Sequence, residues 1–138
     1  MLDLHTKVGF KQAIAPQVQT NSNVAIVGAI IDTQGFDSVE FAITLGTVAA
    51  GVSGAVTMEH GNDPALADTA APAAGDIVGS ANFVTADSNT VKKVGYLPKL
   101  NAPKRYLRIT VTPAGNGAAS LPIAGTAVLS DARQGPVA

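Results

Sequence analysis

The chain has 138 residues, of which 46% are hydrophobic, 14% charged and 4% aromatic, and its formal net charge is −1. This length is typical of one domain that buries its own core. Without a basic excess the chain is poorly suited to the phosphate backbone, so we expect no nucleic-acid partner. The absence of cysteine excludes disulfides, thiolate nucleophiles and cysteine-ligated zinc.

The low charge also bears on the surface of the protein, since an average domain has about 25% charged residues. We expect a surface that is partly covered by copies of the chain or by a larger assembly. The N-terminus shows no basic region followed by an apolar run, so no signal peptide is visible. The longest apolar stretch, residues 24–31, has eight residues, whereas about twenty are needed to cross a bilayer. We therefore expect a soluble protein without a membrane partner.

The first twenty residues differ in pattern from the rest of the chain. Their apolar side chains are scattered among polar ones, and Pro16 would interrupt a helix. Val8 and Phe10 alternate with lysines, as in a strand. Two interpretations remain open: a first strand followed by a loop, or an extended arm that lies on a neighbouring molecule.

Strand signals begin after a turn cluster at residues 21–23. The continuous apolar run 24–31 predicts a strand buried on both faces. The clearest strand lies between Gly35 and Gly46, where apolar and polar residues alternate over eight positions. Residues 52–60 are predicted to be its hairpin partner.

Residues 61–75 form the most irregular stretch, with two prolines that exclude a regular ladder. A short extended piece is expected over residues 76–84. Residues 90–97 and 104–112 then predict two strands, separated by a loop between Pro98 and Pro103.

The end of the chain contains one more predicted strand. Asn116-Gly117 is the pair that favours positive φ in a turn. The last strand is predicted over residues 119–129, where Pro122 implies a sheet edge or a late start of the pairing.

About seven strands and no helical stripe predict an all-β protein, a single-domain antiparallel β-sandwich or barrel. We divide it into an N-terminal arm or first strand (residues 1–20), a β-sandwich domain (21–130) and a mobile C-terminal tail (131–138). The strand between Gly35 and Gly46 and the strand at Leu107, Ile109 and Val111 are expected to form the two main walls of the core.

Motifs for catalysis are absent from the sequence. There is no phosphate-binding loop, no dinucleotide fingerprint and no nucleophile elbow, so we expect no enzyme, no catalytic residue and no cofactor. The best polar cluster is residues 59–63 with Asp68 nearby. It is compatible with a divalent cation or with His60 as a base, but a strand that ends in a polar turn explains it without any metal.

Positive charge is concentrated between Val91 and Arg108. Stacking aromatics in series are missing, so a single-strand nucleic-acid platform is disfavoured. A contact with an acidic partner or a solvated strand face explains the pattern better.

Five stretches of the chain resemble, in the same order, small structural proteins of tailed bacteriophages that decorate or stabilise the capsid. They are QGFDSVEF (residues 34–41), EHG (59–61), KVGY (93–96), KRYLR (104–108) and TPAGN (112–116). The resemblance implies a non-enzymatic virion protein that is assembled in the host cytoplasm and lies on the capsid surface. It implies the major capsid protein as partner and a homo-oligomer, with a trimer favoured because capsids offer three-fold sites.

Such a protein needs apolar or arm-like segments that lie across capsomer joints. The residues we expect at capsid or subunit contacts are Leu2, Leu4, Val8, Phe10, Tyr106 and Arg108.

Two alternatives stay open at this stage. One is a tail-tube, neck or fibre-associated protein of the same kind of particle. The other is a carbohydrate-binding β-sandwich module, which ranks lower because the chain has no tryptophan and only two tyrosines and four phenylalanines for stacking on sugars.

Overall fold

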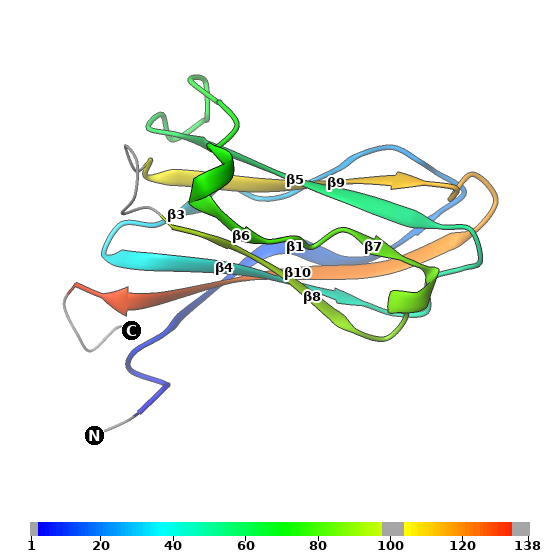
Figure 1. Ribbon diagram of the computed structural model, residues 1–138, viewed down its shortest axis with the longest axis horizontal. Coiled ribbons are helices and arrows are strands. Elements are labelled where there is room, and N and C mark those ends of the chain that lie inside the picture. The colour runs from blue at the N-terminus through cyan, green and yellow to red at the C-terminus, as the bar shows by residue number, and fades with distance from the viewer. Residues whose placement is uncertain (1–2, 98–103, 134–138) are drawn as a thin grey trace.

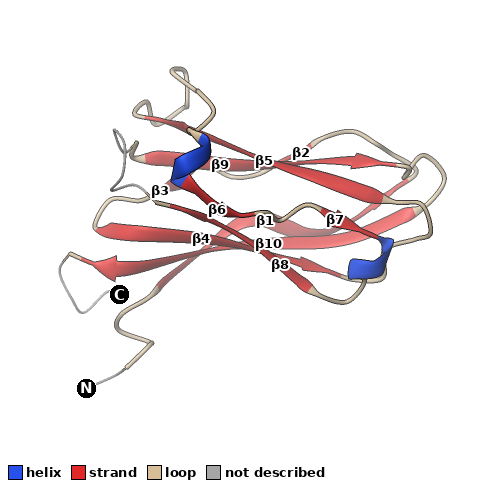
Figure 2. Cartoon of the chain, viewed as in Figure 1, coloured by secondary structure: helices blue, strands red, loops and turns tan. Residues whose placement is uncertain are grey.

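A computed structural model describes residues 3–97 and 104–133 of the chain. Ten strands and two short 3₁₀ helices form two antiparallel sheets packed face to face (Figures 1 and 2). Both sheets keep free edges, so the fold is a β-sandwich and the barrel alternative is wrong. The prediction of an all-β fold is confirmed, with more strands than the seven expected.

The first sheet, which we call the β10 sheet, has the strand order β1-β10-β4-β8-β6. Its strands are β1 (Gly9–Thr20), β4 (Phe36–Leu45), β6 (Ile77–Gly79), β8 (Val91–Tyr96) and β10 (Ser120–Ala132). The second, the β9 sheet, has the order β2-β9-β5-β7, with β3 also paired to β9. Its strands are β2 (Ile26–Val27), β3 (Ile31–Asp32), β5 (Ser53–Gly61), β7 (Phe83–Val84) and β9 (Tyr106–Ala114). The 3₁₀ helices are η1 (Ala74–Asp76) and η2 (Thr85–Asp87).

The core lies between β4 and β9, as the alternation of both segments predicts. Phe41 and Ile43 of β4 are fully buried, and so is Ile109 of β9. Because successive strand residues point to opposite sides, each strand presents its apolar residues to the other sheet and its polar ones outward. The expectation that these two strands form the main walls of the core is confirmed.

The apolar run at residues 24–31 does not form the predicted strand. Only the short strands β2 and β3 are present, and Val24 and Val27 are 70% and 59% exposed. Between them the backbone turns toward both sheets: Gly28 N donates to Ile109 O at 2.9 Å, and Ala29 N donates to Ala13 O at 2.7 Å. The segment therefore joins the two sheets along one side of the sandwich instead of lying inside one sheet.

The predicted hairpin between β4 and β5 is also wrong. β4 pairs with β10 and β8, whereas β5 pairs with β9 and β7 in the other sheet. The loop between them carries the chain from one sheet to the other. The extended piece after residue 76 changes sheet in the same way, since β6 and β7 belong to different sheets.

The first twenty residues contain a strand over Gly9–Thr20, which pairs with β10 at one edge of its sheet. The register is irregular between Gln12 and Gln17, and Pro16 lies within this irregular part. A bulge of this kind is one place where an edge strand tolerates proline.

The last strand is not at a sheet edge, since β10 lies between β1 and β4. It pairs with β1 from Ser120 but with β4 only from Ile123, and Gly46 N donates to Pro122 O at 3.0 Å. Pro122 has no N–H to donate, and it lies at the point where β4 ends. The prediction of a late start of the pairing is therefore confirmed for the pairing with β4. β10 continues to Ala132, past the predicted limit; residues 134–138 of the predicted tail and the 98–103 loop lie outside the described residues.

The turn after β9 differs from its predicted form. Positive φ occurs at Gly115, at 75°, and not at the Asn116-Gly117 pair. Gly115 packs against the backbone of Gly51, where a side chain has no room. Asn116 is instead fully buried and holds the turn by its side chain.

Candidate interaction surface

A buried hydrogen bond links the two sheets at one end of the sandwich. His60 of β5 is 8% exposed and Tyr96 of β8 is 1% exposed, and His60 Nδ1 lies 2.8 Å from Tyr96 Oη. The Tyr96 oxygen accepts the N–H of Lys104 at 3.3 Å, so its own proton is available to His60 Nδ1. Burial lowers the pKa of His60 and keeps the ring neutral. This geometry assigns His60 to a structural link between the sheets.

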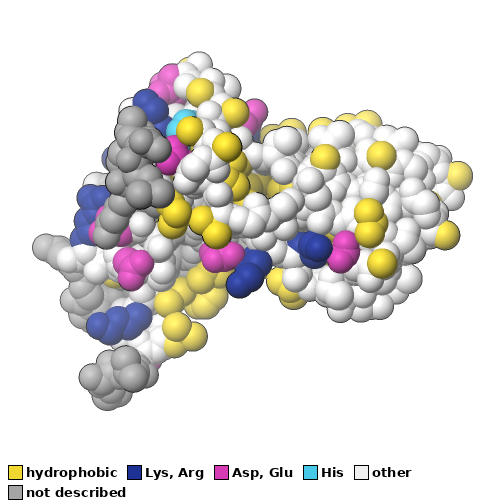
Figure 3. Space-filling model, in the orientation of Figure 1, with side chains coloured by type: hydrophobic (Ala, Val, Ile, Leu, Met, Phe, Trp, Pro, Cys, Tyr) yellow, Lys and Arg dark blue, Asp and Glu magenta, His cyan; other side chains and the backbone are white. Residues whose placement is uncertain are grey.

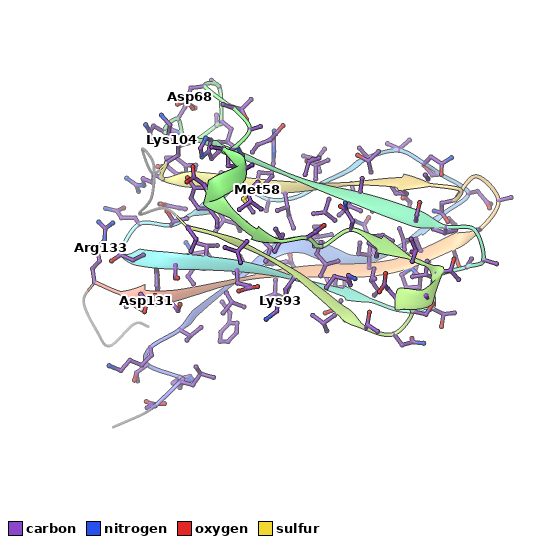
Figure 4. The ribbon with its side chains drawn as sticks, viewed as in Figure 1. Met58, Asp68, Lys93, Lys104, Asp131 and Arg133 are labelled. Carbon is purple, nitrogen blue, oxygen red and sulfur yellow. The ribbon has the colours of Figure 1, made fainter. Side chains whose placement is uncertain are left out.

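The acidic residues beside His60 are used by the backbone of the following loop. Asp68 accepts the N–H groups of Asn62 and Asp63 at 2.8 and 3.0 Å, and Asp63 accepts that of Ala65 at 2.7 Å. These N–H donors lower the pKa of Asp68. Figure 4 shows Asp68 and Lys104 at this end of the molecule. Among the described residues, no three His, Asp or Glu side chains are grouped so as to hold a metal ion. The polar-turn interpretation fits this arrangement.

The arginines of the basic segment are neutralised by carboxylates. Arg105 donates to both carboxylate oxygens of Asp32 at 2.8 Å, and this pairing lowers the pKa of Asp32 to about 2. Arg108 donates to Glu59 Oε2 at 2.6 and 3.0 Å. The Arg105 guanidinium also lies 5.0 Å from the centre of the Tyr106 ring. A solvated strand face explains Arg105 and Arg108, because each is paired with a carboxylate of the same chain.

The outward side of the β9 sheet, which we call the β9 face, is polar at its centre. Its residues are Val27, Asp32, Ser53, Ala55, Thr57, Glu59, Gly61, Val84, Tyr106, Arg108, Thr110, Thr112 and Ala114. The two exposed valines lie on the short strands at its two edges, and threonines and the Glu59–Arg108 pair fill the middle. This is the usual composition of a sheet face in water.

The outward side of the β10 sheet, the β10 face, is different. Its residues are Phe10, Gln12, Val18, Ser38, Glu40, Ala42, Thr44, Val78, Val91, Lys93, Gly95, Pro122, Ala124, Thr126, Val128 and Ser130. Four of the nine exposed large hydrophobic side chains in the described part of the chain lie here: Phe10, Val18, Val78 and Val91. Glu40 and Lys93 are the only charged residues on this face. An apolar, nearly uncharged sheet face is typical of an association surface.

The register places one continuous row across all five strands of this face. Phe10 lies opposite Val128, Val128 opposite Glu40, Glu40 opposite Gly95, and Gly95 opposite Val78. Lys93 is in the next row, beside Ala42. Figure 4 shows its side chain pointing away from the interior of the sandwich.

Charge is also unevenly distributed along the molecule. Figure 3 shows most charged side chains of this view at the end that carries the β5–η1 loop, and few at the opposite end. Four of the five stretches that carry the phage resemblance reach this charged end, through Gln34, His60, Tyr96 and Arg105. Hydrogen bonds connect them there: His60 with Tyr96, the Lys104 N–H with the Tyr96 oxygen, and the Arg105 side chain with Gln34 Oε1.

The six contact residues expected from sequence fall on different parts of the structure. Leu2 lies outside the described residues. Leu4 is 68% exposed and Phe10 63% exposed, and Val8 is half-buried. Tyr106 and Arg108 lie on the polar β9 face, away from the other three. The structure therefore groups the N-terminal residues near the β10 sheet and separates the last two from them.

The N-terminal segment, residues 3–8, leads away from the sandwich (Figure 1). A turn shapes it, since Leu4 O accepts the N–H groups of Lys7 and Val8 at 3.2 and 3.1 Å. The side chain of Asp3 also accepts the Thr6 hydroxyl at 2.8 Å. Leu4 is thus presented on a formed turn outside the core.

Sequence reasoning missed the members of the β10 face that come from β6, β8 and β10. The outward residues of β4 were the available signal, because they are small or singly charged. Which residues lie beside them depends on the sheet order, and the sequence does not show that order.

The chain matches no protein-family model, no curated protein and no solved structure. Neither helix in the described part of the chain has the length and apolar character needed to cross a membrane.

Proposed function

We propose that this protein is a non-enzymatic structural protein of a tailed-phage particle, most specifically a decoration protein that binds the major capsid protein. The observation that carries the proposal is the β10 face, an apolar sheet face with two charges. Five short sequence stretches that resemble phage head proteins supply the kind of particle. A surface of this kind is stabilised by burial in an assembly.

The contact with the capsid is assigned to the N-terminal segment, at Leu4. Leu4 is mostly exposed on a turn that stands clear of the sandwich, so it can enter an apolar groove of a neighbour without disturbing the fold. Val8 and Phe10 continue this apolar segment into the edge strand β1.

Antibody labelling of intact phage particles tests the proposal. Gold-labelled antibody against the purified protein is expected on the head surface in electron micrographs. Label on the tail or neck would support the alternative placement in the particle. A protein found only in the soluble lysate, with unlabelled particles, would overturn the proposal.

A matched pair of variants tests the N-terminal contact. L4D places a charge on the proposed contact and is expected to lower the copy number per head at least several-fold, as measured by quantitative mass spectrometry of purified particles. V24D is the control, because Val24 is 70% exposed but lies in the loop before β2. Equal occupancy for both variants would rule out this contact.

A further inference from the structure

The two charged residues of the β10 face are close neighbours of opposite sign. Glu40 lies opposite Gly95, and Lys93, two residues earlier on β8, lies opposite Ala42. Neither makes an ion pair with another described residue, whereas Glu59 and Arg108 on the β9 face pair with each other. One anion and one cation are therefore left without an ionic partner inside an otherwise uncharged surface.

The surface around these charges is hollowed. A groove of about 420 Å³ is lined by both charged residues and by Val78, Gly95 and Val128. The floor is at Gly95, where a Cβ would lie 3.6 Å from Val78 Cβ and 3.7 Å from Glu40 Oε2. Gly95 itself is buried, and the side chains of Val78 and Glu40 that flank it both line the groove.

The face is also large enough for a specific contact. The sheet has five strands, and β4 has ten residues. With strands about 4.8 Å apart and a rise of about 3.3 Å per residue, this face covers roughly 700 Å². An interface of standard size takes about 800 Å² from each partner.

We infer that the β10 face binds the same face of a second copy of this chain across a two-fold axis. In this dimer, Glu40 of each copy lies opposite Lys93 of the other, and the surrounding apolar side chains are buried between the two sheets. The inference rests on the proposed function in one respect, namely that this face is an association surface.

Charge complementarity selects a second copy as the occupant. A two-fold axis brings identical patches together and exchanges any two positions related by it. A patch with one anion beside one cation is therefore complementary to itself, and a single axis forms both ion pairs. A different protein would need its own matching charges, and nothing on this face requires them.

Charge reversal tests the pairing. Alone, E40K places two lysines opposite two lysines in the dimer, and K93E places two glutamates opposite two glutamates. Each variant is expected to dissociate at least about 10-fold more readily than the original chain in sedimentation equilibrium, because two attractive contacts become repulsive. An equimolar mixture of the two variants restores both opposite-charge pairs and is expected to form the heterodimer.

The mixture separates this contact from effects within one chain. In each single variant the neighbouring side chains at positions 40 and 93 have like charge, and mixing does not change that. Recovery of dimer on mixing can therefore come only from contacts between chains. T110K is the control on the β9 face and is expected to leave the dimer unchanged, and circular dichroism of every variant checks its folding.

The results that would overturn the inference are distinct. A monomer at all concentrations, a dimer insensitive to both reversals, or a mixture as weak as its components would each exclude this pairing. A trimer with the same insensitivity would exclude it as well. Head labelling together with any of these results would leave the proposed function standing, and dimerisation without particle labelling would remove the proposed function alone.

Discussion

His60 is a buried ring whose charged form is disfavoured in the folded protein, because burial lowers its pKa. Its pKa is lowered from 6.5 first by burial and then by the charge of Lys104, while Asp76 and Asp68 act in the opposite direction. The unfolded chain therefore binds a proton at this position more readily than the folded chain. We expect the free energy of unfolding to fall as the pH decreases below about 6.5.

Urea denaturation at several pH values between 7.5 and 5 measures this effect. H60Q is expected to lower stability at neutral pH but to flatten the decrease, because it removes the titrating group. An equally steep decrease in H60Q would assign the pH dependence to other groups. The Asp32–Arg105 contribution stays constant in this range, since the pKa of Asp32 is about 2 and that contribution is lost only as the pH falls below about 3.8.

Asn116 joins the turn after β9 to the end of β1 and the turn that follows it, through its side chain and its backbone N–H. Its amide donates to Gln19 O at 3.0 Å and Ser22 O at 2.9 Å, and its backbone N–H donates to Asn23 Oδ1 at 2.7 Å. N116A leaves two carbonyls without their donor and is expected to destabilise the fold by about 3 kcal/mol in chemical denaturation.

The exposed Asn82 provides the control for this substitution. Its side chain accepts the Val56 N–H at 2.7 Å in a solvated setting. N82A is expected to cost about 1 kcal/mol or less, since water replaces the lost bond. Equal costs for the two alanine variants would contradict the role of burial at Asn116.

Among the secondary-structure elements, the segment from β2 to β3 depends on one glycine. A Cβ at Gly28 would lie 2.6 Å from Ile109 O and 2.8 Å from Ala13 O, and both are backbone atoms that cannot turn aside. G28A is expected to destabilise the protein by about 2 kcal/mol or more and to lower its thermal midpoint. G75A is expected to be close to neutral, because a Cβ at Gly75 has no atom within 4 Å.

The same segment shows where reading the sequence fails. Alternation predicted β4 and β9 well, because each strand has one buried face whose residues recur at every second position. A continuous apolar run carries no such period. At residues 24–31 the run is divided at Gly28, which bonds to β9 of its own sheet, and the next residue, Ala29, bonds to Ala13 in the other sheet. No local signal in the sequence indicates this change.

Strand partners were harder to predict than strands. We expected a hairpin of β4 and β5 because these strands follow each other in the sequence. In the structure, β4 instead pairs with β10 on one side and with β8 on the other. Both strands that pair with β4 are therefore distant from it in the sequence. The same holds for the candidate interaction surface. The outward residues of β4 could be predicted from the sequence, but their neighbours Lys93, Val128 and Val78 could not, because the sequence does not show the strand order.

At the level of the whole molecule, the two outer faces of the sandwich differ in how their charged side chains are paired. The central charges of the β9 face, Glu59 and Arg108, pair with each other, whereas Glu40 and Lys93 of the β10 face make no ion pair with another described residue. The low charge of the composition predicts a partly covered surface, and this stays a prediction. It did not indicate which face would be covered.

The chain's last strand, β10, is the one that joins its first strand to the rest of the sheet. β1 pairs with no strand except β10, and β10 also covers one side of β4. During synthesis, at about 5–20 residues per second, β1 therefore waits without a strand partner until residues 120–132 have left the ribosome. Its exposed edge is open to capture by chaperones or by other nascent chains during that interval. A chain truncated before residue 120 lacks β10 and therefore cannot complete this sheet.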